Sequence, residues 1–205
     1  MDVSRHPRAF RVLSALCALT ASCAHLPEGT PVQTRNDIPA AHAANRDAPA
    51  SAAREIGDRL LALIDSIRDR DDLALAHVAR VTGLPVVAET DSVYLYGVRG
   101  ALAGGWSYRL GATAGADDGA DSLLVTFNHA DGDAADRAPI CDPDFDAYRT
   151  ALEARGFVSQ QVPGDRGSTR YWEFARDGVS VQVHTIGESD ARPGHACVST
   201  LSIRA

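Results

Sequence analysis

Two cysteines far along the chain are the side chains best able to form a covalent bond. The chain has four cysteines, and only Cys141 and Cys197 lie outside its first 23 residues. Neither lies in a CxxC or zinc-type spacing, which a catalytic or metal-binding thiol, the alternative interpretation, would favour. In an oxidising compartment two such thiols pair by default, so the sequence predicts a disulfide between Cys141 and Cys197.

Two clusters of histidine and acidic side chains could carry acid–base or metal chemistry. Residues 129–136 (HADGDAAD) lack the DxDxDG spacing and closing bidentate acid of a calcium loop, and the alternative for them is an acidic surface turn. The second set could meet at the end of the last two strands as an acid–base group, or belong to an ordinary polar loop. Its members are His184, Glu188, Asp190 and His195. We predict no metal, cofactor or catalytic residue, and keep a hydrolase or small-ligand site at His184 and His195 as the alternative.

Several functional classes are excluded by the inventory of residues. All twenty basic residues are arginine, so the chain has no lysine for a Walker phosphate loop, a Schiff base or a lysine general base. The sequence also lacks GxSxG, HExxH and a GxGxxG that follows a strand. The formal charge of −7 argues against binding to nucleic acid, which requires a basic surface.

The first 22 residues have the features of a secretory signal peptide. Arginines precede the short apolar run Val12–Leu19, and small residues follow it up to Cys23. The segment resembles a bacterial lipoprotein signal, and the resemblance implies that Cys23 receives lipid and becomes the mature N-terminus. By the same resemblance, Ala24 in place of an aspartate implies an anchor in the outer membrane, on its periplasmic face. Ordinary cleavage near this point is the alternative, and it would give a soluble periplasmic protein.

We expect three segments along the chain. Residues 1–22 are the signal peptide. Residues 23–50 carry the lipid and form a flexible tether, because four prolines and no apolar periodicity keep this stretch from burying enough surface to fold. Residues 51–205 form a single periplasmic domain. Loss of residues 1–22 changes the formal charge from −7 to −9, since it removes three arginines and one aspartate.

Two helices are expected at the start of this domain. Apolar residues recur at helical spacing from Ile56 to Ile67, which predicts an amphipathic helix. A charged run ends it, and Asp71 or Asp72 can cap a second, shorter helix that ends at Gly83. The two helices are expected to form an N-terminal helical hairpin.

The remainder is predicted to form an antiparallel sheet of about seven strands, with one helix inserted after the third strand. This helix should have Pro143 at its first position and Asp142 as its cap. One face of it should bury Phe145, Tyr148 and Leu152. Short turns between strands and grouped helices favour an α+β fold. The expected strands are Ser92–Arg99, Trp106–Ala112, Ser122–His129, Phe157–Val162, Arg170–Ala175, Val179–Ile186 and Ala196–Ile203.

The last strands indicate which side of the sheet faces the core. Valines alternate with polar residues from Val179 to Val183, so the sheet should have one buried and one wetter face. The dipeptide Asp177-Gly178 before them is typical of a hairpin turn. Cys197 has the parity of the apolar residues in the last strand. It should therefore face the core, beneath the helix that begins just after Cys141.

Four aromatic residues could form a binding surface. Tyr94 and Tyr96 have the same parity in one expected strand, and Trp106 and Tyr108 have the same parity in the next. A hairpin would place the four rings side by side. An exposed patch of such rings would anchor a protein partner, whereas a buried patch would be core beneath a helix.

The segment Leu73–Val98 combines a short helix, a Gly-x-Pro turn and an apolar strand. This order resembles the small lipoproteins that assist outer-membrane protein assembly, and similar helix–helix–sheet units occur in secreted inhibitors of β-lactamase. The resemblance implies a binding module rather than an enzyme. It carries over no functional residue.

We therefore expect a non-enzymatic, periplasm-facing lipoprotein that binds a protein. The partner would be a cell-wall-directed enzyme, neutralised by an inhibitor or immunity protein, or an envelope-assembly component. An acidic domain on a tether suits a basic partner, because complementary charge speeds encounter. The alternatives are the hydrolase or small-ligand protein named above and a purely structural envelope protein.

Overall fold

The computed structural model describes residue 49 and residues 51–205, except 91, 116–118, 166–167 and 190–191. All described residues belong to one compact unit. The expected signal peptide and, except for Pro49, the expected tether with the lipidation site Cys23 lie outside the described residues.

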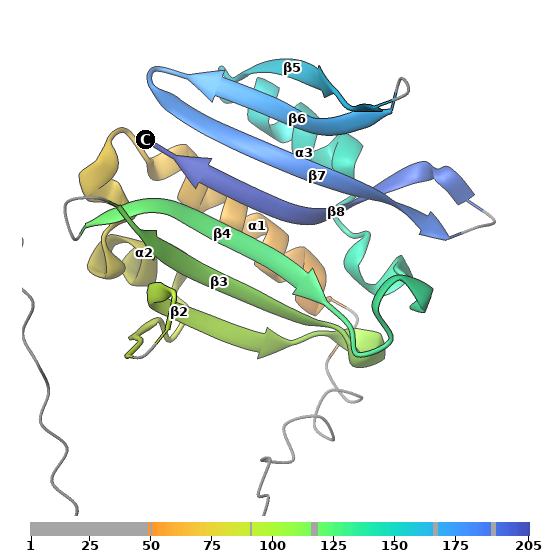
Figure 1. The fold of residues 1–205 in the computed structure, drawn as a ribbon, viewed down its shortest axis with the longest axis horizontal. Helices are drawn as coiled ribbons and strands as arrows, with labels where there is room; N and C mark the ends of the chain where they lie inside the picture. Colours follow the sequence, from red (N-terminus) through yellow and green to blue (C-terminus); the bar gives the residue numbers. More distant parts are fainter. Residues whose placement is uncertain (1–48, 50, 91, 116–118, 166–167, 190–191) are drawn as a thin grey trace, which may run out of the picture. The chain divides into compact units, whose positions relative to one another are not determined.

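One antiparallel sheet of eight strands forms the centre of the described part (Figure 1). Its order is β1-β2-β3-β4-β8-β7-β6-β5, so two four-stranded meanders meet where β4 pairs with β8. We expected about seven strands, and the additional one is the two-residue β1 at one edge. The strands are β1 Val87–Ala88, β2 Tyr94–Ala101, β3 Ser107–Ala114, β4 Ala120–Asn128, β5 Val158–Pro163, β6 Thr169–Arg176, β7 Val179–Ser189 and β8 Arg192–Arg204.

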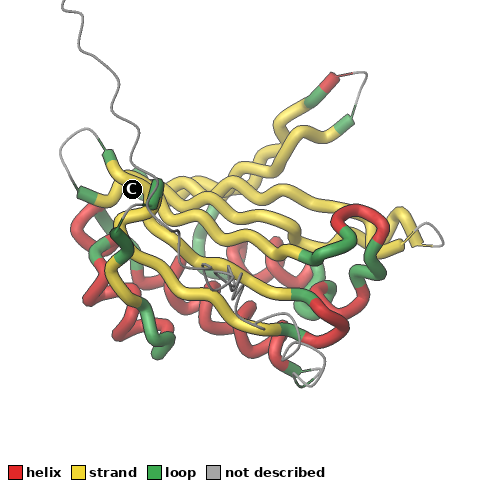
Figure 2. The backbone as a smooth tube through the Cα atoms, turned by 60° about the horizontal axis from the view of Figure 1, so that its bottom comes forward, coloured by secondary structure: helices red, strands yellow, loops and turns green. Residues whose placement is uncertain are grey.

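Three α-helices in the described residues are α1 Ala52–Ser66, α2 Leu75–Thr82 and α3 Phe145–Glu153. All three lie on the same side of the sheet (Figure 2). The molecule thus has a mixed α+β architecture, as the sequence predicted. Because β1 precedes β2, α3 follows the fourth strand in the chain rather than the third.

The core lies between these helices and one face of the sheet. The registers place Tyr96, Ala112 and Leu123 in one row on three neighbouring strands, and the row continues through Ile203 and Val181. All five are buried, because period-two alternation sends every second side chain toward the helices. Val179, Val181 and Val183 are buried too, and the polar residues between them are on the other face, which confirms the predicted alternation.

Helix α3 begins two residues later than predicted. Asp144, not Asp142, is its N-cap, and the Asp144 side chain accepts a hydrogen bond from the backbone N–H of Ala147 at 2.8 Å. Pro143 precedes the helix, follows a cis peptide bond, and lies where a side chain at Gly57 of α1 would be. The predicted buried face is correct, since Phe145, Tyr148 and Leu152 are all buried.

Helix α2 also begins differently from the prediction. A short 3-10 helix, η2 (Arg70–Leu73), follows α1, and its cap is Asp69, which accepts from the backbone N–H of Asp71 at 3.0 Å. The expected caps Asp71 and Asp72 are therefore inside η2. Helix α2 starts without a side-chain cap and ends, as predicted, at Gly83, whose φ of 64° suits a residue without a Cβ.

Candidate functional site

The predicted disulfide is present, since Cys141 and Cys197 are bonded with their Cα atoms 4.6 Å apart. Cys141 follows the 3-10 helix η5 (Ala138–Ile140), and Cys197 lies in β8. Both residues are buried. The bond ties the segment that leads into α3 to the sheet.

A histidine between two carboxylates lies beside this disulfide. His195 Nε2 is 2.9 Å from Asp144 Oδ2, and His195 Nδ1 is 3.3 Å from Glu188 Oε2. The same Nδ1 is 3.6 Å from the Sγ atom of Cys141. Glu188 is 4% exposed, so a carboxylate that normally remains in water is here enclosed by protein.

Three separate elements bring these groups together. Glu188 is near the end of β7 and His195 is near the start of β8, where the register shifts between Gly187 and Ser189. Asp144 has two roles, because its Oδ1 caps α3 while its Oδ2 accepts from His195. Since a carboxylate can only accept, Nε2 carries the proton that faces Asp144, and Nδ1 is the ring nitrogen beside the disulfide.

The structure therefore assembles only part of the predicted acid–base set. Glu188 and His195 do meet, and sequence reasoning missed Asp144, whose only local signal was its position before α3. His184 lies elsewhere, on the sheet face opposite the helices, with its ring 5.5 Å from the ring of Tyr171. Asp190 lies outside the described residues.

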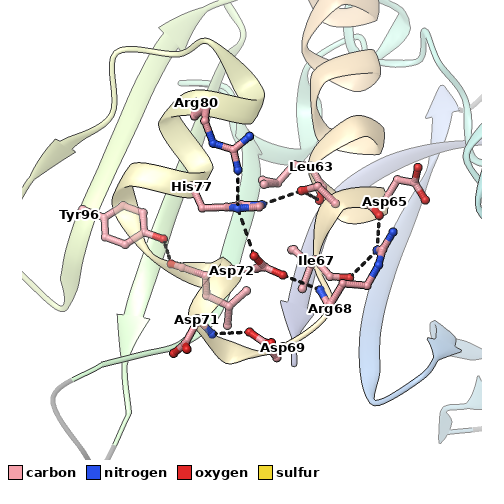
Figure 3. A network of polar contacts seen from close by, with 12 residues as sticks. Leu63, Asp65, Ile67, Arg68, Asp69, Asp71, Asp72, His77, Arg80 and Tyr96 are labelled. Carbon is pink, nitrogen blue, oxygen red and sulfur yellow. Dashed lines mark hydrogen bonds and ion pairs between the residues drawn. The ribbon is translucent and has the colours of Figure 1, made fainter.

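A second polar cluster joins α1, η2 and α2 around His77 (Figure 3). His77 Nε2 is 2.8 Å from Ser66 Oγ, and Nδ1 is 3.2 Å from Asp72 Oδ1. These distances match the connections in a Ser-His-Asp hydrolase triad. The spacing of the three residues in the sequence did not predict this cluster.

The hydrogen bonds around His77 run in the wrong direction for such a triad. The Ser66 hydroxyl donates to the carbonyl of Leu63 at 2.7 Å, so its oxygen can only accept from His77, and Nε2 carries the proton between them. On the other side of the ring, Nδ1 faces a donor, Arg80 Nη2 at 2.9 Å, and an acceptor, Asp72 Oδ1 at 3.2 Å. In this arrangement Nε2 cannot take a proton from Ser66, and the cluster links helices instead.

Three of the four aromatic residues proposed as binding anchors are in the core. Tyr96, Trp106 and Tyr108 are 4%, 5% and 7% exposed. The Tyr96 hydroxyl donates to the Leu73 carbonyl, and Trp106 Nε1 donates to the Asp136 carbonyl at 2.8 Å. Of the two interpretations that the sequence left open, core beneath the helices is therefore correct for these three, and their burial excludes them as surface anchors.

Tyr94 is on the opposite face from Tyr96, although their spacing predicted a shared face. A shift in the β2–β3 register between the two residues acts as a β-bulge and reverses the alternation. The Tyr94 ring lies against Gly111, and the Arg109 guanidinium is 4.0 Å from its centroid. Arg109 Nη2 also contacts both Glu89 oxygens, at 2.7 and 2.6 Å.

The Glu89 carboxylate should make the stability of this outer cluster depend on pH. Hydrogen bonds from Ser92 and then Arg109 hold the pKa of Glu89 below its usual range. A lowered pKa in the folded state stabilises the protein above the unfolded carboxyl pKa, about 4.3, and this contribution is lost as pH falls through the folded value. We expect the urea midpoints of the protein and its Glu89→Gln variant to differ at pH 7 and to converge below about pH 4. A difference that stayed constant from pH 7 to 3 would contradict the assignment.

The histidine of the HADGDAAD segment stabilises a turn. His129 Nδ1 accepts from the backbone N–H of Asp131 at 3.0 Å, and Nε2 is 3.0 Å from the carbonyl of Gly104. Both ring nitrogens are therefore used by backbone groups. The Asp131 side chain is 76% exposed, as an acidic surface turn would have it.

None of the three described α-helices covers the opposite face of the sheet (Figure 2). One cross-strand row runs over all eight strands from edge to edge. In order it contains Val87, Gly97, Gly111, Leu124, Ser202, Gln182, Glu173 and Gln160. A neighbouring row passes through Arg99, Arg109, Thr126, Thr200 and His184. We call this surface the open face.

Comparison with known proteins gave no match to a family model, to a curated protein or to a solved structure. Among the described helices, none has the length and apolar character needed to cross a membrane.

Proposed function

We propose that this chain is a periplasm-facing lipoprotein of the outer membrane that binds a basic protein partner, without catalysis, through the open face. The signal-like N-terminus and Cys23 support the location. The disulfide suits an oxidising compartment. Helices α1, α2 and α3 would support the sheet from behind.

The observation that carries the proposal is the half of the open face from β8 to β5, where Ser202, Gln182, Glu173 and Gln160 form a polar row. A sheet with a buried inner face usually leaves its outer face to solvent, and such a face can be flat enough to meet another protein. Near its centre, Thr126 pairs with Thr200, and Ser202 lies between Leu124 and Gln182. Short hydroxyl side chains offer hydrogen bonds at little cost in side-chain entropy, and the half-buried Tyr94 and Tyr171 rings lie on the same face.

Charge indicates the kind of partner. Residues 51–205 contain 15 arginines against 23 aspartates and glutamates, a formal charge of −8. Such a domain attracts positively charged proteins and repels acidic ones during diffusional encounter. A basic cell-wall-directed enzyme fits this requirement best, which favours an inhibitor or immunity protein over an assembly factor.

The test is capture of a partner from a periplasmic extract by the immobilised mature chain and by matched arginine variants. Thr126→Arg combined with Thr200→Arg places two bulky cations at the centre of the open face. We expect the mature chain to retain one stoichiometric basic protein at low salt, and the double variant to retain at least tenfold less. Retention should also fall as salt rises.

Thr150→Arg is the matched control, because Thr150 is exposed on α3, on the other side of the molecule. It makes the same threonine-to-arginine change once rather than twice, and should leave capture unaffected. Circular dichroism must show that all variants are folded. Equal capture by the open-face variant, or no retained protein at low salt, would overturn the proposal.

A further inference from the structure

We propose that the cluster around the disulfide becomes a zinc site when the Cys141–Cys197 bond is reduced. The four ligand atoms would be the two Sγ atoms, Nδ1 of His195 and Oε2 of Glu188. This inference goes beyond the proposed function, since the cluster is distinct from the open face. It also revises the expectation of no metal, which rested on sequence spacing alone.

Two distances between donor atoms match a tetrahedral zinc site, whereas the two sulfurs, which are bonded to each other in this structure, must separate to about 3.8 Å after reduction. Zinc bonds of about 2.3 Å to sulfur and about 2.0–2.2 Å to nitrogen and oxygen place a nitrogen about 3.5 Å from a sulfur and about 3.4 Å from an oxygen. The structure has His195 Nδ1 at 3.6 Å from Cys141 Sγ and at 3.3 Å from Glu188 Oε2. One donor atom each from Cys141, Glu188 and His195 lies within 4.8 Å of the others.

Asp144 holds the histidine in the orientation that a metal ligand needs. Its Oδ2 atom is 2.9 Å from Nε2, and the other ring nitrogen, Nδ1, lies beside Cys141 Sγ. Histidines that bind zinc are typically fixed in this way by a carboxylate on the second nitrogen. Asp144 is itself held as the cap of α3, which makes it a positioning residue for the site.

The surroundings also suit a buried metal that solvent can reach from one side. Glu188 and both cysteines are buried, whereas the side chain of His195 is 37% exposed. Zinc could therefore enter past the imidazole, and its charge of +2 would offset the −2 of the two thiolates. The set of two cysteines, one histidine and one glutamate uses ligand types that zinc prefers.

The chemistry balances with a dithiol as the reductant. The dithiol gives two electrons and two protons to the disulfide and becomes a disulfide itself, leaving two thiols at Cys141 and Cys197. Zn²⁺ then binds both sulfurs as thiolates and releases their two protons. Re-oxidation of the thiolates by a disulfide of the same class would expel the metal. Zinc binding would thus depend on the redox state of the cysteine pair.

Cobalt and zinc titrations of the purified chain test the proposal. The disulfide is first reduced with a phosphine, which competes weakly for metal, and the reductant is removed without air. The reduced chain should bind one Co²⁺ with the absorption typical of thiolate-to-cobalt charge transfer, and Zn²⁺ should displace it. The oxidised chain should show no such absorption.

Three variants separate this site from general metal binding by thiols. In the reduced state His195→Ala should weaken Zn²⁺ binding at least tenfold. Asp144→Asn should weaken it about 10- to 100-fold, since asparagine still caps α3 but no longer orients the imidazole as a carboxylate does. His184→Ala, which removes a histidine outside the cluster, should leave Zn²⁺ binding unchanged.

The proposal fails if the reduced, folded chain shows no thiolate-to-cobalt absorption or if His195→Ala binds Zn²⁺ as tightly as the unchanged chain. If reduction unfolds the chain, zinc must restore its circular dichroism spectrum, and must do so less well with His195→Ala. A reduced chain that stays unfolded in excess zinc would overturn the proposal equally.

Discussion

Replacing Cys141 and Cys197 together by alanine should lower the free energy of unfolding by about 4 kcal/mol. The two residues are 56 apart in sequence, and cross-linking a loop of this length removes many conformations from the unfolded chain. In the folded chain the bond joins the segment before α3 to β8, so its loss also frees the α3 cap from the sheet. A domain of this kind typically has a total stability of about 5–15 kcal/mol, of which this is a large share.

Urea unfolding of the oxidised protein and the double variant measures this loss. A reducing buffer provides the control, because neither protein then has the bond. The difference between their free energies of unfolding should shrink to the small contribution that the two cysteine side chains make by packing. Metal must be chelated throughout, so that zinc cannot take the place of the cross-link. A loss below about 1 kcal/mol in oxidising buffer would contradict the expected contribution of the loop.

The arrangement of strands was largely predictable because alternation of apolar and polar residues is a local signal. The valines of β7 show it directly, and the Asp177-Gly178 turn before them takes the positive φ angles, 47° and 87°, that its residues favour. The two-residue β1 was missed because Val87 and Ala88 are both exposed and show no alternation.

The prediction of sheet faces from odd and even residue positions failed where the backbone departs from a regular strand. Tyr94 and Tyr96 were expected on one face, and the β-bulge between them separates the rings. A bulge depends on pairing with the next strand, so residue spacing within β2 alone could not predict it. The cap of α3 is a similar case, because aspartates precede and follow Pro143 and the usual preference for proline at the first helical position favoured the wrong one.

The sequence did not predict the complete histidine clusters, for a different reason. His195 and Glu188 were identified as possible partners because a short loop separates their strands. Asp144 is 51 residues from His195, and only the packing of α3 against the sheet brings them together. Likewise, the contacts of His77 come from the ends of two helices and η2. Polar side chains follow no periodic pattern that indicates where they will meet, so the sequence alone does not predict these clusters.

Phe174→Ala should cost about 3–5 kcal/mol of folding stability, the range for removing a buried phenylalanine. Phe174 is 0% exposed, and its ring is 6.4 Å from that of Phe145 on α3. Its neighbours in the cross-strand row are Val181 on β7 and Ser159 on β5. The side chain thus fills the space between α3 and the second meander, and its loss would leave a cavity there.

Val158→Ala on the neighbouring strand is the matched control for this cavity. Val158 is 73% exposed and pairs with Ala175, the residue next to Phe174. Its truncation should change the free energy of unfolding by at most about 0.5 kcal/mol, as for ordinary surface positions. If Phe174→Ala cost no more than the control, α3 would not be packed on the sheet as described. The placement of Asp144 beside His195 would then lose its support, because it depends on the same packing.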